Sequence, residues 1–145
     1  MISKRPGTAV WNGGLTEGKG TLSTRSGALN ALPYSFVSRF KNDDGTLGTN
    51  PEELLGAAHA GCFTMALSMI LGQQGLTADE LKTTATVLLE NDPEKLGIAG
   101  VELAVEGKVP GATAEQFEQA AEAAKKNCLV SKALNVPVTL SVKFV

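Results

Sequence analysis

Apolar and polar positions along the chain, with turns between them, predict a succession of strands and helices. Short runs that alternate or are rich in β-branched residues predict six strands, over residues 8–12, 20–24, 33–40, 82–90, 98–109 and 136–145. In the third strand, the aromatic side chains are expected to face away from Arg39. In the fifth, residues 101–106 (VELAVE) alternate, so one face is expected to be buried and the other wet. Asn42-Asp43-Asp44-Gly45 is predicted to form a loop.

A first helix is predicted to begin at Asn50-Pro51-Glu52-Glu53. Asn50 can cap the helix, Pro51 suits its first position, and Glu53 can close a capping box. The helix continues through the uncharged segment 54–71 (LLGAAHAGCFTMALSMIL) and is expected to end at Gly72 or Gly75. Because this segment is apolar all round, we expect it to be a central helix buried on nearly all sides.

A second, amphipathic helix is predicted to begin at Thr113-Ala114-Glu115-Gln116, which has the capping-box pattern. Its apolar side carries Phe117, Ala120, Ala121 and Ala124. The order of elements is then βββ-α-ββ-α-β. Runs of antiparallel strands with segregated helices predict an α+β fold.

Composition narrows the class of protein. The chain has 145 residues, of which 43% are hydrophobic and 19% charged, as expected for a single domain over residues 1–145. Thirteen Lys and Arg residues stand against fifteen Asp and Glu, for a net charge of −2. Bulk charge therefore offers nucleic acid no attraction, and we expect no nucleic-acid partner.

The uncharged segment has the minimum length for a membrane span, but a buried helix explains it better. It contains His59, Thr64 and Ser68, and much of it is alanine and glycine. We therefore expect no membrane partner. Residues 1–7 are basic but are not followed by an apolar stretch of signal-peptide length, so we expect a cytoplasmic protein with reduced thiols.

The two cysteines, Cys62 in the uncharged helix and Cys128 after the second helix, have two interpretations. Cysteine is commonly a small core residue, so both thiols can be inert. The alternative is thiol chemistry. A zinc site is a poor interpretation, because His59 is the only histidine and no CxxC spacing occurs. We expect no metal and no cofactor.

Five separated segments together resemble the OsmC/Ohr family, the osmotically inducible protein C and organic hydroperoxide resistance proteins. They are WNG (11–13), KGTLST (19–24), Pro33-Tyr34 leading to Arg39-Phe40, TNPEELLGAAHAGCFTMALSMIL (49–71) and CLVSKAL (128–134). The first three resemble the OsmC branch in particular. One position departs from the pattern: the family usually has proline directly after the second cysteine, where this chain has Leu129.

The resemblance implies the OsmC-like fold, an intertwined homodimer and a thiol peroxidase for organic hydroperoxides in oxidative or osmotic stress defence. It implies that Cys62 attacks the peroxide, that Cys128 resolves the resulting sulfenic acid into a disulfide, and that Arg39 and Glu52 tune the first thiol. It also suggests a lipoyl-type dithiol as the external reductant.

The chemistry of thiols is consistent with these roles. The thiolate is the nucleophile, and burial in an apolar helix raises the pKa of a thiol, so we expect Cys62 to react only if a cation such as Arg39 reaches it.

Glu52 and Cys62 are ten residues apart, about 15 Å on a straight helix. Either the helix breaks near Gly56, or the site takes residues from two subunits, which we favour. His59 shares a helical face with Cys62; it is either a base or, as we favour, a buried hydrogen-bonded core residue.

We therefore predict a cysteine-based peroxidase with an apolar pocket lined by Phe63, Met65, Met69 and strand aromatics. The rival hypothesis is a non-enzymatic dimeric stress protein or small-ligand-binding protein with inert buried cysteines.

Overall fold

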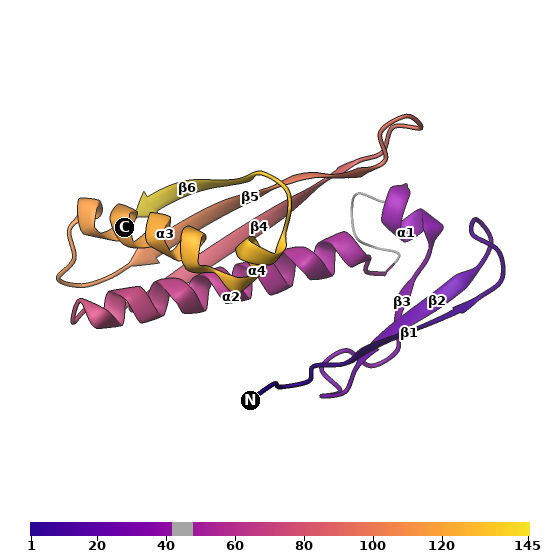
Figure 1. Ribbon diagram of the computed structural model, residues 1–145, viewed down its shortest axis with the longest axis horizontal. Helices are drawn as coiled ribbons and strands as arrows, with labels where there is room; N and C mark the ends of the chain where they lie inside the picture. The colour runs from indigo at the N-terminus through magenta and orange to yellow at the C-terminus, as the bar shows by residue number, and fades with distance from the viewer. Residues whose placement is uncertain (42–47) are drawn as a thin grey trace. The chain divides into compact units, whose positions relative to one another are not determined.

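Runs of strands are followed by runs of helices along the chain, as in an α+β protein, which confirms the predicted fold class (Figure 1). The computed structural model describes residues 1–41 and 48–145, so the loop predicted at Asn42–Gly45 lies outside the described residues. The chain divides into two compact units, residues 1–54 and 55–145.

The first unit contains a small antiparallel sheet. Its strands are β1 (Gly7–Asn12), β2 (Lys19–Thr24) and β3 (Leu32–Tyr34), in the order β1-β2-β3. The rings of Trp11 and Tyr34 lie 5.3 Å apart, and Gly20 leaves the space that both rings occupy. The aromatic residues of this sheet thus cluster around one glycine.

The strand predicted over residues 33–40 is wrong over residues 36–40. The strand β3 ends at Tyr34, and a short helix, α1 (Phe36–Phe40), follows it. The cause is a capping box: the Ser38 N–H donates to Ser35 Oγ at 3.1 Å, and the Ser35 N–H donates to Ser38 Oγ at 2.8 Å. Phe36 and Phe40 are then one helical turn apart, with ring centroids separated by 5.0 Å. Arg39 is consequently a helical residue.

The second unit contains a three-stranded sheet in the order β4-β5-β6. The strands β4 (Glu80–Glu90) and β5 (Gly97–Lys108) are antiparallel, but β6 (Val138–Phe144) runs parallel to β5. Wholly antiparallel pairing was therefore wrong. A parallel pair needs a long crossover, and here it contains α3 (Ala114–Asn127) and the unpredicted short helix α4 (Leu129–Ala133).

The core lies between this sheet and the helices α2 (Pro51–Gln73) and α3, which run along it (Figure 1). Alternate residues of β5 are buried, as predicted for residues 101–106. Thr113 caps α3 in the predicted capping box, and the four apolar residues predicted for its inner side are its buried residues. The buried α2 side chains that face them are Phe63, Leu67 and Leu71.

Within the second unit, one face of the helix α2 is buried in the core. It is long and apolar enough to cross a membrane by length and composition, yet only 33% of that window is buried. The face that carries Phe63 and Leu67 belongs to the core, whereas Met65 and Met69 on another face are 77% and 56% exposed. The sheet can cover a helix on one side only, so the apolar surface of α2 exceeds what the second unit covers.

Candidate active site

The structure brings Cys62 and Cys128 together although 66 residues separate them in sequence. Both are free thiols; Cys62 is partly exposed on α2, and Cys128 is fully buried between α3 and α4. The Cys128 thiol donates a hydrogen bond to the Cys62 sulfur. Cys128 has a φ of −59° and a ψ of 124°, which ends α3 and starts α4. This bend sets the start of α4 against Cys62.

The ionisation of Cys62 is governed by burial and by hydrogen bonds that oppose it. Burial raises the pKa of the Cys62 thiol, but hydrogen bonds from the Val130 N–H, the Cys128 thiol and the Leu129 N–H together outweigh burial. The net pKa is below the ordinary value for a thiol. The expectation that only a cation can lower this pKa is therefore wrong. Nothing in a residue pattern signals main-chain donors.

Arg39 and Glu52 form an ion pair within the first unit. Arg39 Nη2 lies 2.7 Å from Glu52 Oε1, and Arg39 Nε donates to both carboxylate oxygens at 3.2 Å. The Glu52 side chain is 8% exposed and that of Arg39 39%. The guanidinium also lies 5.0 Å above the ring of Phe40. Glu52 thus holds the planar fork of Arg39 in one orientation, with part of its edge open.

Hydrogen bonds between α1 and the start of α2 bring this pair together. Ser38 Oγ donates to the Thr49 carbonyl at 3.0 Å, and Asn50 Nδ2 donates to the Ser38 carbonyl at 3.2 Å. The Glu53 N–H donates to Asn50 Oδ1 at 2.8 Å, which confirms Asn50 as the helix cap. The Glu53 carboxylate, however, accepts from Thr49 Oγ1 at 3.2 Å, and its residue is exposed. Of the two adjacent glutamates, only Glu52 turns towards Arg39.

The helix α2 does not break between Glu52 and Cys62. It is continuous from Pro51 to Gln73, which excludes a break near Gly56 as the way to join the two residues in one site. Gly56 serves another purpose: a Cβ there would lie 2.8 Å from the Ala85 carbonyl oxygen, so the glycine lets α2 approach β4 closely.

An aromatic hollow of about 280 Å³ lies beside Arg39. It is lined by Trp11, Leu15, Tyr34, Ser35, Phe36, Arg39 and Phe40. Of the side chains expected to line an apolar pocket, Phe63 is wrong because it is 0% exposed within the core. Strand aromatics were also expected there, and Trp11 and Tyr34 line this hollow together with Phe36 and Phe40 of α1.

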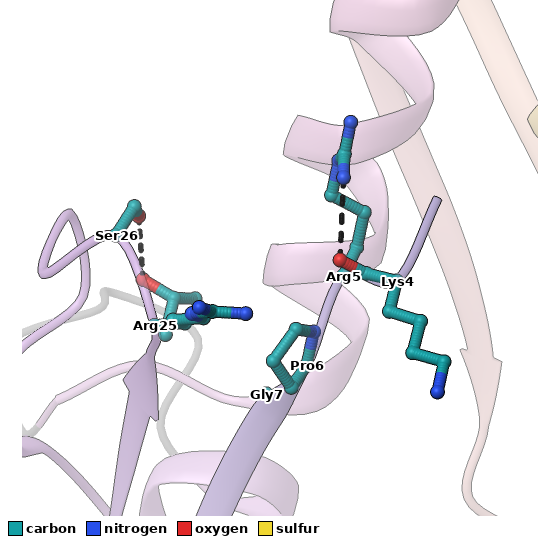
Figure 2. Close-up of a pocket in the computed structure, with 7 residues that line it drawn as sticks. Lys4, Arg5, Pro6, Gly7, Arg25 and Ser26 are labelled. Carbon is teal, nitrogen blue, oxygen red and sulfur yellow. Dashed lines mark hydrogen bonds between the residues drawn. The ribbon is translucent and has the colours of Figure 1, made fainter. Parts of the chain in front are cut away.

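A second hollow, of about 660 Å³, lies at the end of β1 and β2 (Figure 2). Its lining includes the exposed cations Lys4, Arg5 and Arg25. Arg5 Nη1 donates to the Lys4 carbonyl at 3.2 Å, and the hydroxyls of Thr24 and Ser26 lie 3.1 Å apart. Neither Cys62 nor Cys128 is among its lining residues.

His59 is a buried core residue, as favoured from the sequence. Its exposure is 0%, and its Nε2 lies 2.7 Å from Ser131 Oγ on α4. Its Nδ1 has no hydrogen-bond partner among the described residues. Burial lowers the pKa of His59 and thereby favours the neutral ring. Within residues 1–41 and 48–145, no three His, Cys, Asp or Glu side chains are grouped to bind a metal ion.

Known proteins that are similar to this chain carry the names OsmC or organic hydroperoxide resistance protein. The family model for OsmC-like protein matches residues 42–143. Peroxiredoxin OsmC of Escherichia coli (strain K12) is 46% identical over 140 residues, which cover 97% of this chain and 96% of that protein. Organic hydroperoxide resistance protein-like 1 of Staphylococcus saprophyticus is 37% identical over 70% of this chain and 74% of its own. A solved organic hydroperoxide resistance protein from Legionella pneumophila is 27% identical with a TM-score of 0.71, covering 99% of this chain and 98% of that one.

Proposed function

Because this chain belongs to the OsmC-like protein family, we propose that it is a cysteine-based peroxidase that reduces organic hydroperoxides to alcohols. The observation that carries the proposal is the Cys62–Cys128 contact, in which one thiol has a lowered pKa and the other lies within hydrogen-bonding distance. The names of the relatives, peroxiredoxin and organic hydroperoxide resistance protein, support the same reaction.

The reaction begins with the Cys62 thiolate. Its sulfur attacks the terminal oxygen of ROOH, the O–O bond breaks, and the leaving alkoxide takes a proton to become ROH. Cys62 is left as a sulfenic acid. Cys128 then attacks that sulfur, a disulfide forms and water leaves. An external dithiol reduces the disulfide by thiol–disulfide exchange and is itself oxidised. The resemblance favours a lipoyl-type dithiol.

Arg39 and Glu52 complete the proposed site, because the carboxylate of Glu52 orients the guanidinium cation of Arg39. A guanidinium held by a carboxylate can donate to the thiolate and to the departing oxygen at once. Since α2 is unbroken, we propose that the Arg39–Glu52 pair of one subunit acts at Cys62 of the other subunit. This arrangement requires a homodimer.

The exposed face of α2 supports the proposed homodimer. Ala58, Gly61, Met65 and Ser68 are exposed at spacings of three and four residues, so they lie on one face of the helix. This face is uncharged, and uncovered apolar helix surface is typical of a contact between subunits. A second copy of the chain offers an identical face and can cover it.

The aromatic hollow beside Arg39 supports an organic substrate. Hydrogen peroxide gains nothing from aromatic surface, whereas the alkyl part of an alkyl or fatty-acid hydroperoxide is removed from water there. We expect the protein to act in the cytoplasm, where dithiol reductants keep thiols reduced.

Two substitutions test the reaction. Cys62→Ser should abolish turnover, and Cys128→Ser should retain one stoichiometric turnover and then accumulate sulfinic acid at Cys62, because no thiol caps the sulfenic acid. Mass spectrometry after peroxide treatment measures both. A Cys128→Ser protein that gains no oxygen at Cys62 contradicts the proposal.

The rival function, a binding protein with inert cysteines, predicts a different thiol titration. At about pH 5, a low-pKa thiol still reacts with an alkylating reagent, whereas two ordinary thiols do not. An organic peroxide and hydrogen peroxide, each assayed with dithiol reductants, then define the substrate class.

A further inference from the structure

The helices α2 and α4 meet at two neighbouring polar contacts. On α2, His59 and Cys62 are three residues apart and share a face. On α4, Leu129 and Val130 supply N–H groups to the Cys62 sulfur, and Ser131 supplies a hydroxyl to His59. The two contacts therefore join the same two segments, one turn apart.

The contact between His59 and Ser131 is specific because the buried ring has few partners. His59 is fully buried, and its Nε2 lies 2.7 Å from Ser131 Oγ. Nδ1 has no hydrogen-bond partner among the described residues, so the polar contact of this ring there is the one with Ser131. The ring is not hydrogen-bonded to Cys62, so the arrangement does not support His59 as its base.

The donors that reach Cys62 depend on where α4 lies. Leu129 and Val130 are the first two residues of α4, and helix geometry leaves such N–H groups without a partner inside the helix. No side chain caps this helix at Cys128. With five residues, α4 has little stability of its own, so its position depends on what it packs against.

We propose that the buried His59–Ser131 hydrogen bond positions α4 so that its first two main-chain N–H groups point at the Cys62 sulfur. His59 is then a positioning residue, which acts on the thiolate through Ser131 and α4. This inference rests on the proposed role of Cys62 as the nucleophile. The physical reason is that a hydrogen bond to a charged acceptor weakens steeply when its distance or angle changes.

The test compares variants by the pH dependence of Cys62 alkylation with iodoacetamide, followed on the Cys62 peptide by mass spectrometry. Ser131→Ala should raise the pKa of Cys62 by about one unit. At a pH below that pKa, the alkylation rate should fall about tenfold. Ser131→Thr keeps a hydroxyl and should restore most of the wild-type rate.

Two further variants separate positioning from stability. The double variant His59→Leu/Ser131→Ala removes both polar partners, leaves no unpaired ring nitrogen and should fold even if Ser131→Ala does not. It should show the same raised pKa. Thr64→Val is the matched control, because Thr64 Oγ1 makes a hydrogen bond of the same length, 2.7 Å, from α2 to Thr83 on β4. This control should weaken the fold without moving the pKa of Cys62.

An unchanged Cys62 pKa in the folded double variant would overturn the inference, as would an equal shift in Thr64→Val. Alkylation of Cys62 is measured without peroxide. Its result therefore tests the positioning inference independently of the proposed peroxidase function. A wild-type protein with a low-pKa Cys62 but no peroxide turnover contradicts the proposed function and leaves the positioning inference standing. Normal turnover together with an unshifted double variant contradicts the positioning inference alone.

Discussion

At the scale of single residues, the thiolate of Cys62 depends on main-chain N–H groups, which nearly every residue type supplies. The Leu129 N–H is one of them. Leu129 is 74% exposed, so its side chain has little part in packing. Cys128, before it, has the extended backbone that a following proline permits, and the first position of a helix accommodates proline well. The backbone at Leu129 can therefore lose its N–H without changing shape.

Leu129→Pro should raise the pKa of Cys62 by up to about one unit while the protein stays folded. Leu129→Ala keeps the N–H and should leave that pKa unchanged.

Because the folded-state pKa of Cys62 lies below its ordinary value, the stability due to these hydrogen bonds is fully present above the unfolded pKa. It is lost as the pH falls through the folded pKa. Urea unfolding should accordingly separate wild type from Leu129→Pro more at alkaline than at acidic pH.

Glu52 and Glu53 are adjacent acids in the first turn of α2 with different surroundings. Glu52→Gln should slow attack on the peroxide, because the guanidinium of Arg39 loses its ionic anchor. Glu53→Gln removes the same charge from the helix start and should cost roughly 0.3–1 kcal/mol of stability with little change in rate. Stopped-flow kinetics with an organic peroxide measures both variants. Equal effects on the rate would mean that Glu52 is only a helix-start residue.

At the scale of elements, the close approach of α2 to β4 limits which residues fit at their contact. The Cβ of Gly56→Ala would lie 2.8 Å from the Ala85 carbonyl oxygen, so the two elements must separate. We expect a loss of about 1–2 kcal/mol in the free energy of unfolding, despite the better helix propensity of alanine. Gly72→Ala, whose Cβ would meet nothing within 4 Å, should gain up to about 1 kcal/mol. Urea denaturation compares the two; similar values would contradict the close approach.

At the scale of the whole molecule, the uncovered face of α2 predicts the oligomeric state. Met65 is 77% exposed and lies near the middle of that face. Wild type should sediment as a dimer at low micromolar concentration, whereas Met65→Asp places an unpaired charge in the contact and should give monomers. The monomers should also lose peroxidase activity if Arg39 acts across subunits. A fully active wild-type monomer would contradict both the dimer and the shared site.

Elements with local signals could be predicted from the residue pattern alone. Thr113 and Gln116 start α3 because a capping box spans four residues, and Asn50 caps α2 through the N–H three residues on. The alternation in β5 and the inner side of α3 follow from periods of two and 3.6 residues. Residues 36–40 are an exception, because Ser35 and Ser38 cap each other and form a helix where the aromatic spacing also fits a strand.

The contacts of the candidate site, in contrast, join segments that are far apart in the sequence. His59 and Ser131 are 72 residues apart, and Cys62 reaches main-chain groups whose residue types carry no signal. The parallel pairing of β6 and the uncovered face of α2 also depend on how distant segments pack. The physical reason is that periodicity and capping act within a few residues, whereas the pKa of a thiol depends on every donor and every apolar group that the fold brings to it.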